Sequence, residues 1–149
     1  MTEPTFAADL DGLTNDIAAS RAELVSAIQA LSDADLAKVR RGGWPVHRVL
    51  EHVIESEWLY ATLIAHLQGK PVPERGKTSC EGQPVDDVLR MLEASRLAVV
   101  GTLAGVEEDV FYDVQRMGHE EYSVYSVLEN VANHDREHAG QIAAIVAAS

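Results

Sequence analysis

Two histidines near the C-terminus stand where the sequence pattern requires buried apolar side chains. Over residues 124–146 apolar residues recur every three or four positions, and His134 and His138 continue that stripe. Residues four apart share one helix face, so the two imidazoles should stack about 6 Å apart. Burying an imidazole without a partner costs about 1–3 kcal/mol. A shared divalent metal ion would remove this cost, because each ring can donate a lone pair to it.

His52 is the best candidate for a third ligand. It flanks another apolar stripe, one residue before Val53, and about two turns into an expected helix. At that height in a helical bundle it can meet the middle of the helix that carries His134 and His138. Three neutral imidazoles leave a coordination position for water or substrate, which suits a catalytic site better than a purely structural one. We therefore predict one divalent metal ion bound by His52, His134 and His138.

The second nitrogen of each ligating ring would need a hydrogen-bond acceptor. Glu129, Asp135 and Glu137 lie nearby on the same helix and are candidates. A charged residue beside an apolar stripe is more often solvated, however, and solvation is the expectation for Asp135 and Glu137.

The remaining residues of chemical interest have ordinary interpretations. His66 lies about 21 Å along the axis from His52, which is too far to share a metal, and His47 and His119 lie in a first helical turn and a polar loop. Trp44, Trp58 and Tyr60 are expected to pack in the core or at a bundle end. Cys80 has no basic neighbour that would make it a nucleophile. These residues are Trp44, His47, Trp58, Tyr60, His66, Cys80 and His119.

Two sharper metal motifs can be set aside. Residues 134–138 (HDREH) match the H-x-x-E-H pattern of inverted zinc peptidases. Those enzymes need another acidic ligand well downstream, and only eleven residues follow His138. A ferritin-like di-iron site needs Glu-x-x-His motifs, but Val49, Val131 and Asp135 stand three residues before the candidate histidines.

Helical periodicity explains most of the chain and supplies the elements that would position these histidines. Long helices are predicted over about Phe6–Leu31, from Trp44-Pro45 to about Gln68, from Pro84 to Gly105, and from a Ser123 cap nearly to the end. Ser32 should cap a short acidic turn at 33–38, residues 69–83 form a connection, and 105–122 form an ordered loop or short hairpin. The pattern predicts an all-α protein, an antiparallel four-helix bundle with one domain over residues 1–149.

Composition and charge narrow the function further. Hydrophobic residues make up 46% of the chain and aromatics only 5%, a mix that favours helices packed on helices. The 24 acidic and 12 basic residues give a net charge of −12, which disfavours nucleic acids and anionic membranes as partners. A single cysteine, no signal-peptide pattern and no long apolar run predict a cytoplasmic protein.

Two segments resemble a known family. Residues 43–53 (GWPVHRVLEHV) and residues 126–142 (SVLENVANHDREHAGQI), with an H-x-x-x-H-x-x-Q-I pattern, are similar to the DinB-like (DinB/YfiT) superfamily of metal-binding four-helix bundles. The resemblance implies the same three ligands, His52, His134 and His138, and a zinc or nickel ion. It also implies a homodimer.

The resemblance extends to activity. Family members include thiol-dependent S-transferases and maleylpyruvate isomerase, which use bacillithiol, mycothiol or glutathione. The first hypothesis is therefore a metal-dependent enzyme, either a transferase acting with a small thiol or a hydrolase. A non-catalytic, stress-related metal- or ligand-binding bundle, and a structural helical dimer without metal, are the alternatives. No catalytic residue or general base can be assigned from the sequence, although Arg48 and Arg136 lie near the ligands along the chain.

Overall fold

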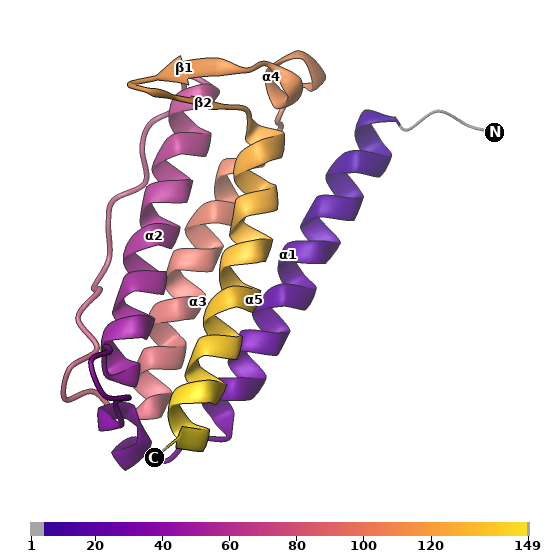
Figure 1. The fold of residues 1–149 in the computed structure, drawn as a ribbon. Coiled ribbons are helices and arrows are strands. Elements are labelled where there is room, and N and C mark those ends of the chain that lie inside the picture. The colour runs from indigo at the N-terminus through magenta and orange to yellow at the C-terminus, as the bar shows by residue number, and fades with distance from the viewer. Residues whose placement is uncertain (1–4, 149) are drawn as a thin grey trace.

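The computed structural model describes residues 5–148, and four long helices dominate this range (Figure 1). They are α1 (Phe6–Gln29), α2 (Val46–Leu67), α3 (Val85–Thr102) and α5 (Val124–Ala148). A short 3-10 helix, η1 (Asp33–Ala37), follows α1. Between α3 and α5 lie the short helix α4 (Glu108–Tyr112) and two three-residue strands, β1 (Gln115–Met117) and β2 (Glu120–Tyr122). The prediction of an all-α fold is confirmed.

Local sequence features account for several helix boundaries. The Ser32 side chain accepts from the backbone N–H of Asp35, whose carboxylate accepts from Ser32 N–H, so η1 begins with a capping box. Pro45 and Pro84 stand immediately before α2 and α3, one position earlier than the predicted first helical position. They still start each helix, because their fixed φ suits the turn into it. Gly69 follows the end of α2 with a φ of +68°, a conformation that glycine adopts readily.

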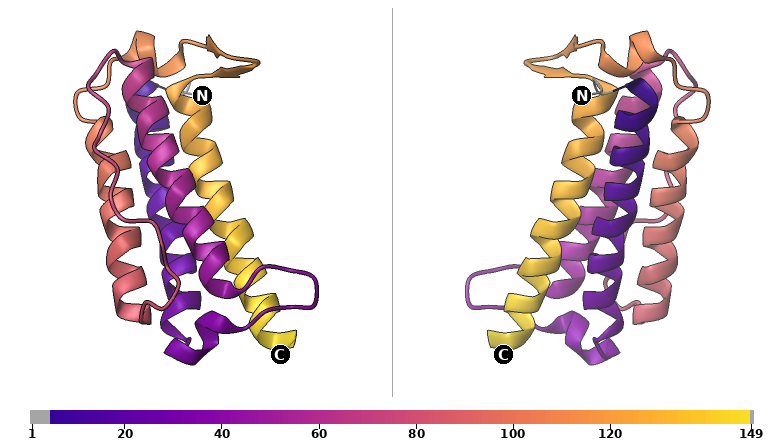
Figure 2. Two further views of the ribbon diagram at one scale, coloured as in Figure 1. Left: turned by 90° about the vertical axis from the view of Figure 1, so that its left-hand side faces the viewer. Right: turned by 90° about the vertical axis from the view of Figure 1, so that its right-hand side faces the viewer.

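The helix directions refine the predicted antiparallel bundle. α1 runs parallel to α5, α2 runs parallel to α3, and the two pairs run in opposite directions (Figures 1 and 2). The connection over residues 69–83 makes this possible, because it returns along the length of the bundle before α3 begins (Figure 1). At one end the Gln68 side chain donates to Thr102 O at 2.7 Å. At the other, Val85 N–H donates to Asp33 at 2.8 Å.

The segment predicted as an ordered loop or short hairpin covers one end of the bundle (Figure 1). β1 and β2 form an antiparallel hairpin. The five-residue helix α4 adds a turn that periodicity did not predict, because so short a helix shows no repeat. Its Phe111 is fully buried and packs edge-on against Phe6, with ring centroids 5.2 Å apart.

The buried apolar side chains form two clusters, one toward each end of the bundle. One contains Leu24, Ile28, Val49, Leu50, Leu92 and Ile142, and the other contains Ile17, Ile64, Val99, Phe111, Val127 and Leu128. None of the helices in residues 5–148 combines the length and the hydropathy needed to cross a membrane.

Candidate metal centre

The three predicted histidines converge between α2 and α5. His134 Nε2 lies 3.2 Å from His52 Nε2 and 3.0 Å from His138 Nε2. The His52 ring is also close to the His138 ring, with centroids 5.1 Å apart. Two helices that run in opposite directions thus bring together side chains that are 82 positions apart in the sequence.

This geometry fits a divalent ion. The three ligand atoms all lie within 4.8 Å of one another. Two nitrogens bound to one tetrahedral zinc ion at about 2.0–2.1 Å lie about 3.3 Å apart, close to the two measured separations. Within the described residues, no other group of three or more His, Cys, Asp or Glu side chains brings its ligand atoms this close together.

A hydrogen bond orients the third ring. His138 Nδ1 lies 2.6 Å from Gln141 Oε1, so Nδ1 carries the proton and donates it to the amide oxygen. In this tautomer the Nε2 atom has its lone pair toward the cluster, the arrangement found around metal-bound histidines. The prediction that Glu129, Asp135 or Glu137 would supply this acceptor is therefore wrong for His138. Gln141 could have been found from its spacing, because residues three apart share a helix face.

The environment favours the unprotonated form of two of the candidate ligands. Burial, and then the neighbouring His138 and His52 rings, lower the pKa of His134 to about 4. Burial is also the largest cause that lowers the pKa of His52, followed by His138 and Arg48. Both rings are partly exposed, whereas His138 is buried. At neutral pH the His52 and His134 lone pairs are therefore available to a metal ion that arrives from solvent.

Two aromatic side chains lie beside the cluster. Trp44 meets the His52 ring edge-on at a centroid distance of 5.7 Å, and Tyr60 meets the His134 ring at 5.8 Å. Trp44 is 46% exposed. The expectation that it packs in the core or at a bundle end did not include this position beside the candidate site. Arg48 stacks over Trp44 at 4.7 Å. Trp58, as expected, is buried in the core.

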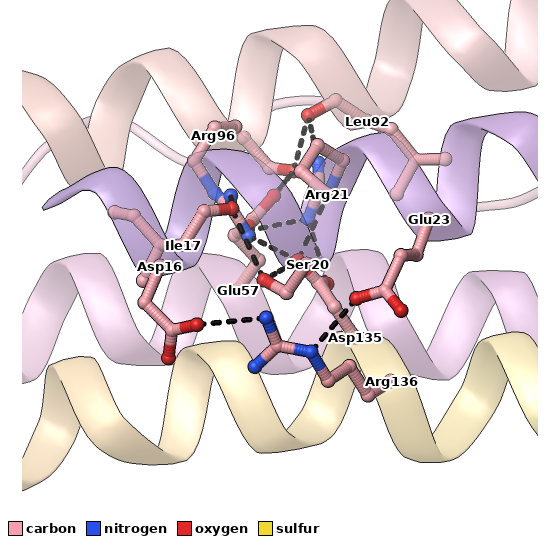
Figure 3. A network of polar contacts seen from close by, with 11 residues as sticks. Asp16, Ile17, Ser20, Arg21, Glu23, Glu57, Leu92, Arg96, Asp135 and Arg136 are labelled. Carbon is pink, nitrogen blue, oxygen red and sulfur yellow. Dashed lines mark hydrogen bonds and ion pairs between the residues drawn. The ribbon is translucent and has the colours of Figure 1, made fainter. Parts of the chain in front are cut away.

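The expectation that Asp135 is solvated is wrong. Its side chain is 2% exposed and contacts the guanidinium groups of Arg21 on α1 and Arg96 on α3 (Figure 3). Arg21 Nη2 lies 3.1 Å from Asp135 Oδ1, and Arg96 Nη2 lies 2.7 Å from Oδ2. The sequence pattern could not predict this burial, because the partners of Asp135 come from helices that are distant in the sequence.

Several other candidates lie outside the cluster. Arg136 pairs with Asp16 and Glu23 of α1, each at 2.7 Å (Figure 3), and so faces α1. Cys80 is fully buried, and burial, with smaller effects of nearby carboxylates, raises the pKa of its thiol to about 12. It is therefore not a nucleophilic thiolate at neutral pH.

Sequence comparison agrees with this architecture. The profile of the DinB superfamily matches residues 16–142, which include all three histidines. The chain belongs to the DinB superfamily. A search of curated proteins finds no match.

Two solved structures share the fold of this DinB superfamily member. A protein described as a four-helix bundle superposes with a TM-score of 0.69 at 21% identity, covering 90% of this chain and 98% of the other. A DinB-like protein from Bacillus cereus superposes with a TM-score of 0.69 at 16% identity, covering 97% of this chain and 92% of the other. At these identities the likeness establishes the fold alone.

Proposed function

We propose that this protein binds one divalent metal ion, zinc or nickel, through the Nε2 atoms of His52, His134 and His138. The observation that carries the proposal is the convergence of these atoms at 3.0 and 3.2 Å. Neutral imidazole is a good ligand for both metals. The His138–Gln141 hydrogen bond at 2.6 Å supports the same conclusion, because it leaves the His138 Nε2 lone pair for the metal.

The number of ligands favours a reactive centre over a structural one. Structural zinc sites in proteins almost always have four protein ligands, whereas catalytic sites have three and leave a position for water or substrate. In residues 5–148 the cluster contains three imidazoles, and two of them are partly exposed. This observation supports the enzyme hypothesis over that of a metal ion that only holds the bundle together.

We further propose a metal-dependent enzyme that is either a transferase acting with a small thiol or a hydrolase. A bound zinc or nickel ion would lower the pKa of a coordinated thiol or water, and so supply an anionic nucleophile at neutral pH. The chain's own residues would hold and orient the reactants. The exposed Trp44 ring and the Arg48 guanidinium stacked on it at 4.7 Å offer an apolar surface and a cation beside His52.

Metal dependence of activity tests this proposal. Protein stripped with a chelator should be inactive in conjugating glutathione with chlorodinitrobenzene and in hydrolysing nitrophenyl acetate, and added zinc or nickel should restore one of these activities. His52→Ala should stay inactive with added metal, whereas His66→Ala, a control on the same helix, should behave as wild type. Activity that survives complete metal removal would contradict the proposal. A protein that binds metal and catalyses neither reaction would favour the non-catalytic alternative.

A further inference from the structure

A buried ionic network joins the four long helices (Figure 3). Along each helix, its residue lies between members of the two apolar clusters. The network joins one charged side chain from each long helix: Arg21 of α1, Glu57 of α2, Arg96 of α3 and Asp135 of α5. The two carboxylates are 3% and 2% exposed, and each guanidinium side chain is 11% exposed. Two positive and two negative charges therefore balance in a nearly dry layer.

Each guanidinium group spans both carboxylates. Arg21 Nη2 lies 2.7 Å from Glu57 Oε2 and 3.1 Å from Asp135 Oδ1. Arg96 contacts Glu57 through Nε at 2.8 Å and Asp135 through Nη2 at 2.7 Å. Glu57 and Asp135 are thereby tied together by two planar bridges, although both are negative.

The tied helices are the two that carry the candidate ligands. Asp135 directly follows His134 in α5, and Glu57 lies five residues after His52 in α2, about 7.5 Å along the axis. The hydrophobic effect that buries Val, Leu and Ala side chains is non-directional. The planar, bidentate hydrogen bonds of arginine have a defined geometry. The network therefore restricts the rotation and height of α5 relative to α2.

Stability alone is a poor explanation for such a layer. Replacing a buried ionic network with well-packed apolar residues is often neutral or stabilising, whereas ionic groups can specify one arrangement of the helices. We propose that Arg21, Glu57, Arg96 and Asp135 are positioning residues that set the register of α5 against α2 at which the three Nε2 atoms converge. This inference rests on the proposed metal site.

A fully apolar layer gives the first test. The quadruple variant Arg21→Met, Glu57→Met, Arg96→Met and Asp135→Leu removes all four charges together. The hydroxyls of Ser20 and Ser95, which also contact the network, keep their bonds to the carbonyls of Ile17 and Leu92. We expect a folded protein with a melting temperature no lower than wild type, but with cobalt(II) affinity reduced about tenfold or more and an altered visible cobalt spectrum.

A single, nearly isosteric variant tests the inference even if the quadruple variant fails to fold. Glu57→Gln removes one charge with little change in shape, and Phe111→Leu is a control that weakens the core at the bundle end, outside the network. At a temperature where both are folded, Glu57→Gln should weaken cobalt binding several-fold and shift the spectrum, and Phe111→Leu should not.

The outcomes separate the two claims. Wild-type cobalt affinity and spectrum in Glu57→Gln, or equal losses in Glu57→Gln and Phe111→Leu, would overturn the positioning role and leave the metal site intact. A wild-type protein that binds no cobalt, zinc or nickel would overturn the metal site itself, and the positioning role with it.

Discussion

At the scale of single residues, the bond between His138 and Gln141 determines which ring nitrogen faces the cluster. The amide oxygen can only accept, so the 2.6 Å contact places the proton on Nδ1. Without that acceptor, the proton could move to Nε2 and block the lone pair. Gln141 would therefore act on the proposed metal site through His138, without itself being a ligand.

Gln141→Leu should weaken zinc binding about 10- to 100-fold, the usual cost of losing a partner behind a metal-bound histidine. Gln141→Glu keeps an acceptor for Nδ1 and should retain affinity. Competition titrations with a chromogenic chelator would measure both. Equal zinc affinity in Gln141→Leu and wild type would show that the hydrogen bond does not support the site.

The residue scale also shows what the sequence could reveal. His134 and His138 were recognisable because they interrupt an apolar stripe on their own helix. Asp135 lies between them, yet its burial depends on Arg21 and Arg96, which come from α1 and α3. Local periodicity carries no information about such distant partners, and the network was therefore missed.

At the scale of elements, α5 must begin at a defined residue for its histidines to face α2. Ser123 and Ser126 fix that start reciprocally: Ser126 N–H donates to Ser123 Oγ at 3.0 Å, and Ser123 N–H donates to Ser126 Oγ at 3.0 Å. This confirms the predicted Ser123 cap. A capping side chain was detectable because both the cap and its helix are local in sequence.

Ser123→Ala should lower the free energy of unfolding by about 1 kcal/mol, because the Ser126 N–H loses its acceptor. Ser123→Asp preserves an acceptor and should remain near wild type. Urea denaturation followed by circular dichroism would compare the three proteins. An unchanged midpoint in Ser123→Ala would mean that the cap contributes nothing to the helix.

The sequence predicts where the helices lie along the chain better than it predicts their relative directions. Strong periodicity predicted all four long helices to within a few residues of their ends. The prolines and glycines of residues 69–83 identify this segment as a connection. They do not predict that it runs back along the bundle and makes α2 and α3 parallel (Figure 1). Loop composition indicates flexibility of the backbone and not the path that the backbone takes.

At the scale of the whole molecule, α3 exposes two large apolar side chains. Leu97 is 63% exposed and Val100 is 47% exposed. Leu97 borders a groove of about 310 Å³ between α1 and α3, which is lined by apolar residues such as Val25 and Leu92 and by charged residues such as Arg21 and Glu93. The family resemblance implies a homodimer, and we propose that two copies of the chain meet at this partly apolar face.

Sedimentation velocity would test the dimer. Wild-type protein should sediment at twice the mass of the chain, and Leu97→Glu should sediment as a monomer, because it places a charge in the apolar contact. Glu108→Lys, a charge change on α4 outside this face, should leave the dimer intact. A monomeric wild type over the micromolar range would contradict this proposal without affecting the metal site.

The most direct test of the account is the metal content of the untagged protein as purified, measured by plasma mass spectrometry. The histidine convergence predicts close to one zinc or nickel ion per chain in the wild type, and loss of that ion in a folded His134→Ala/His138→Ala double variant. A wild-type protein that contains no metal, and also fails to take up added zinc or nickel, would show that the three imidazoles are structural and would contradict the central claim.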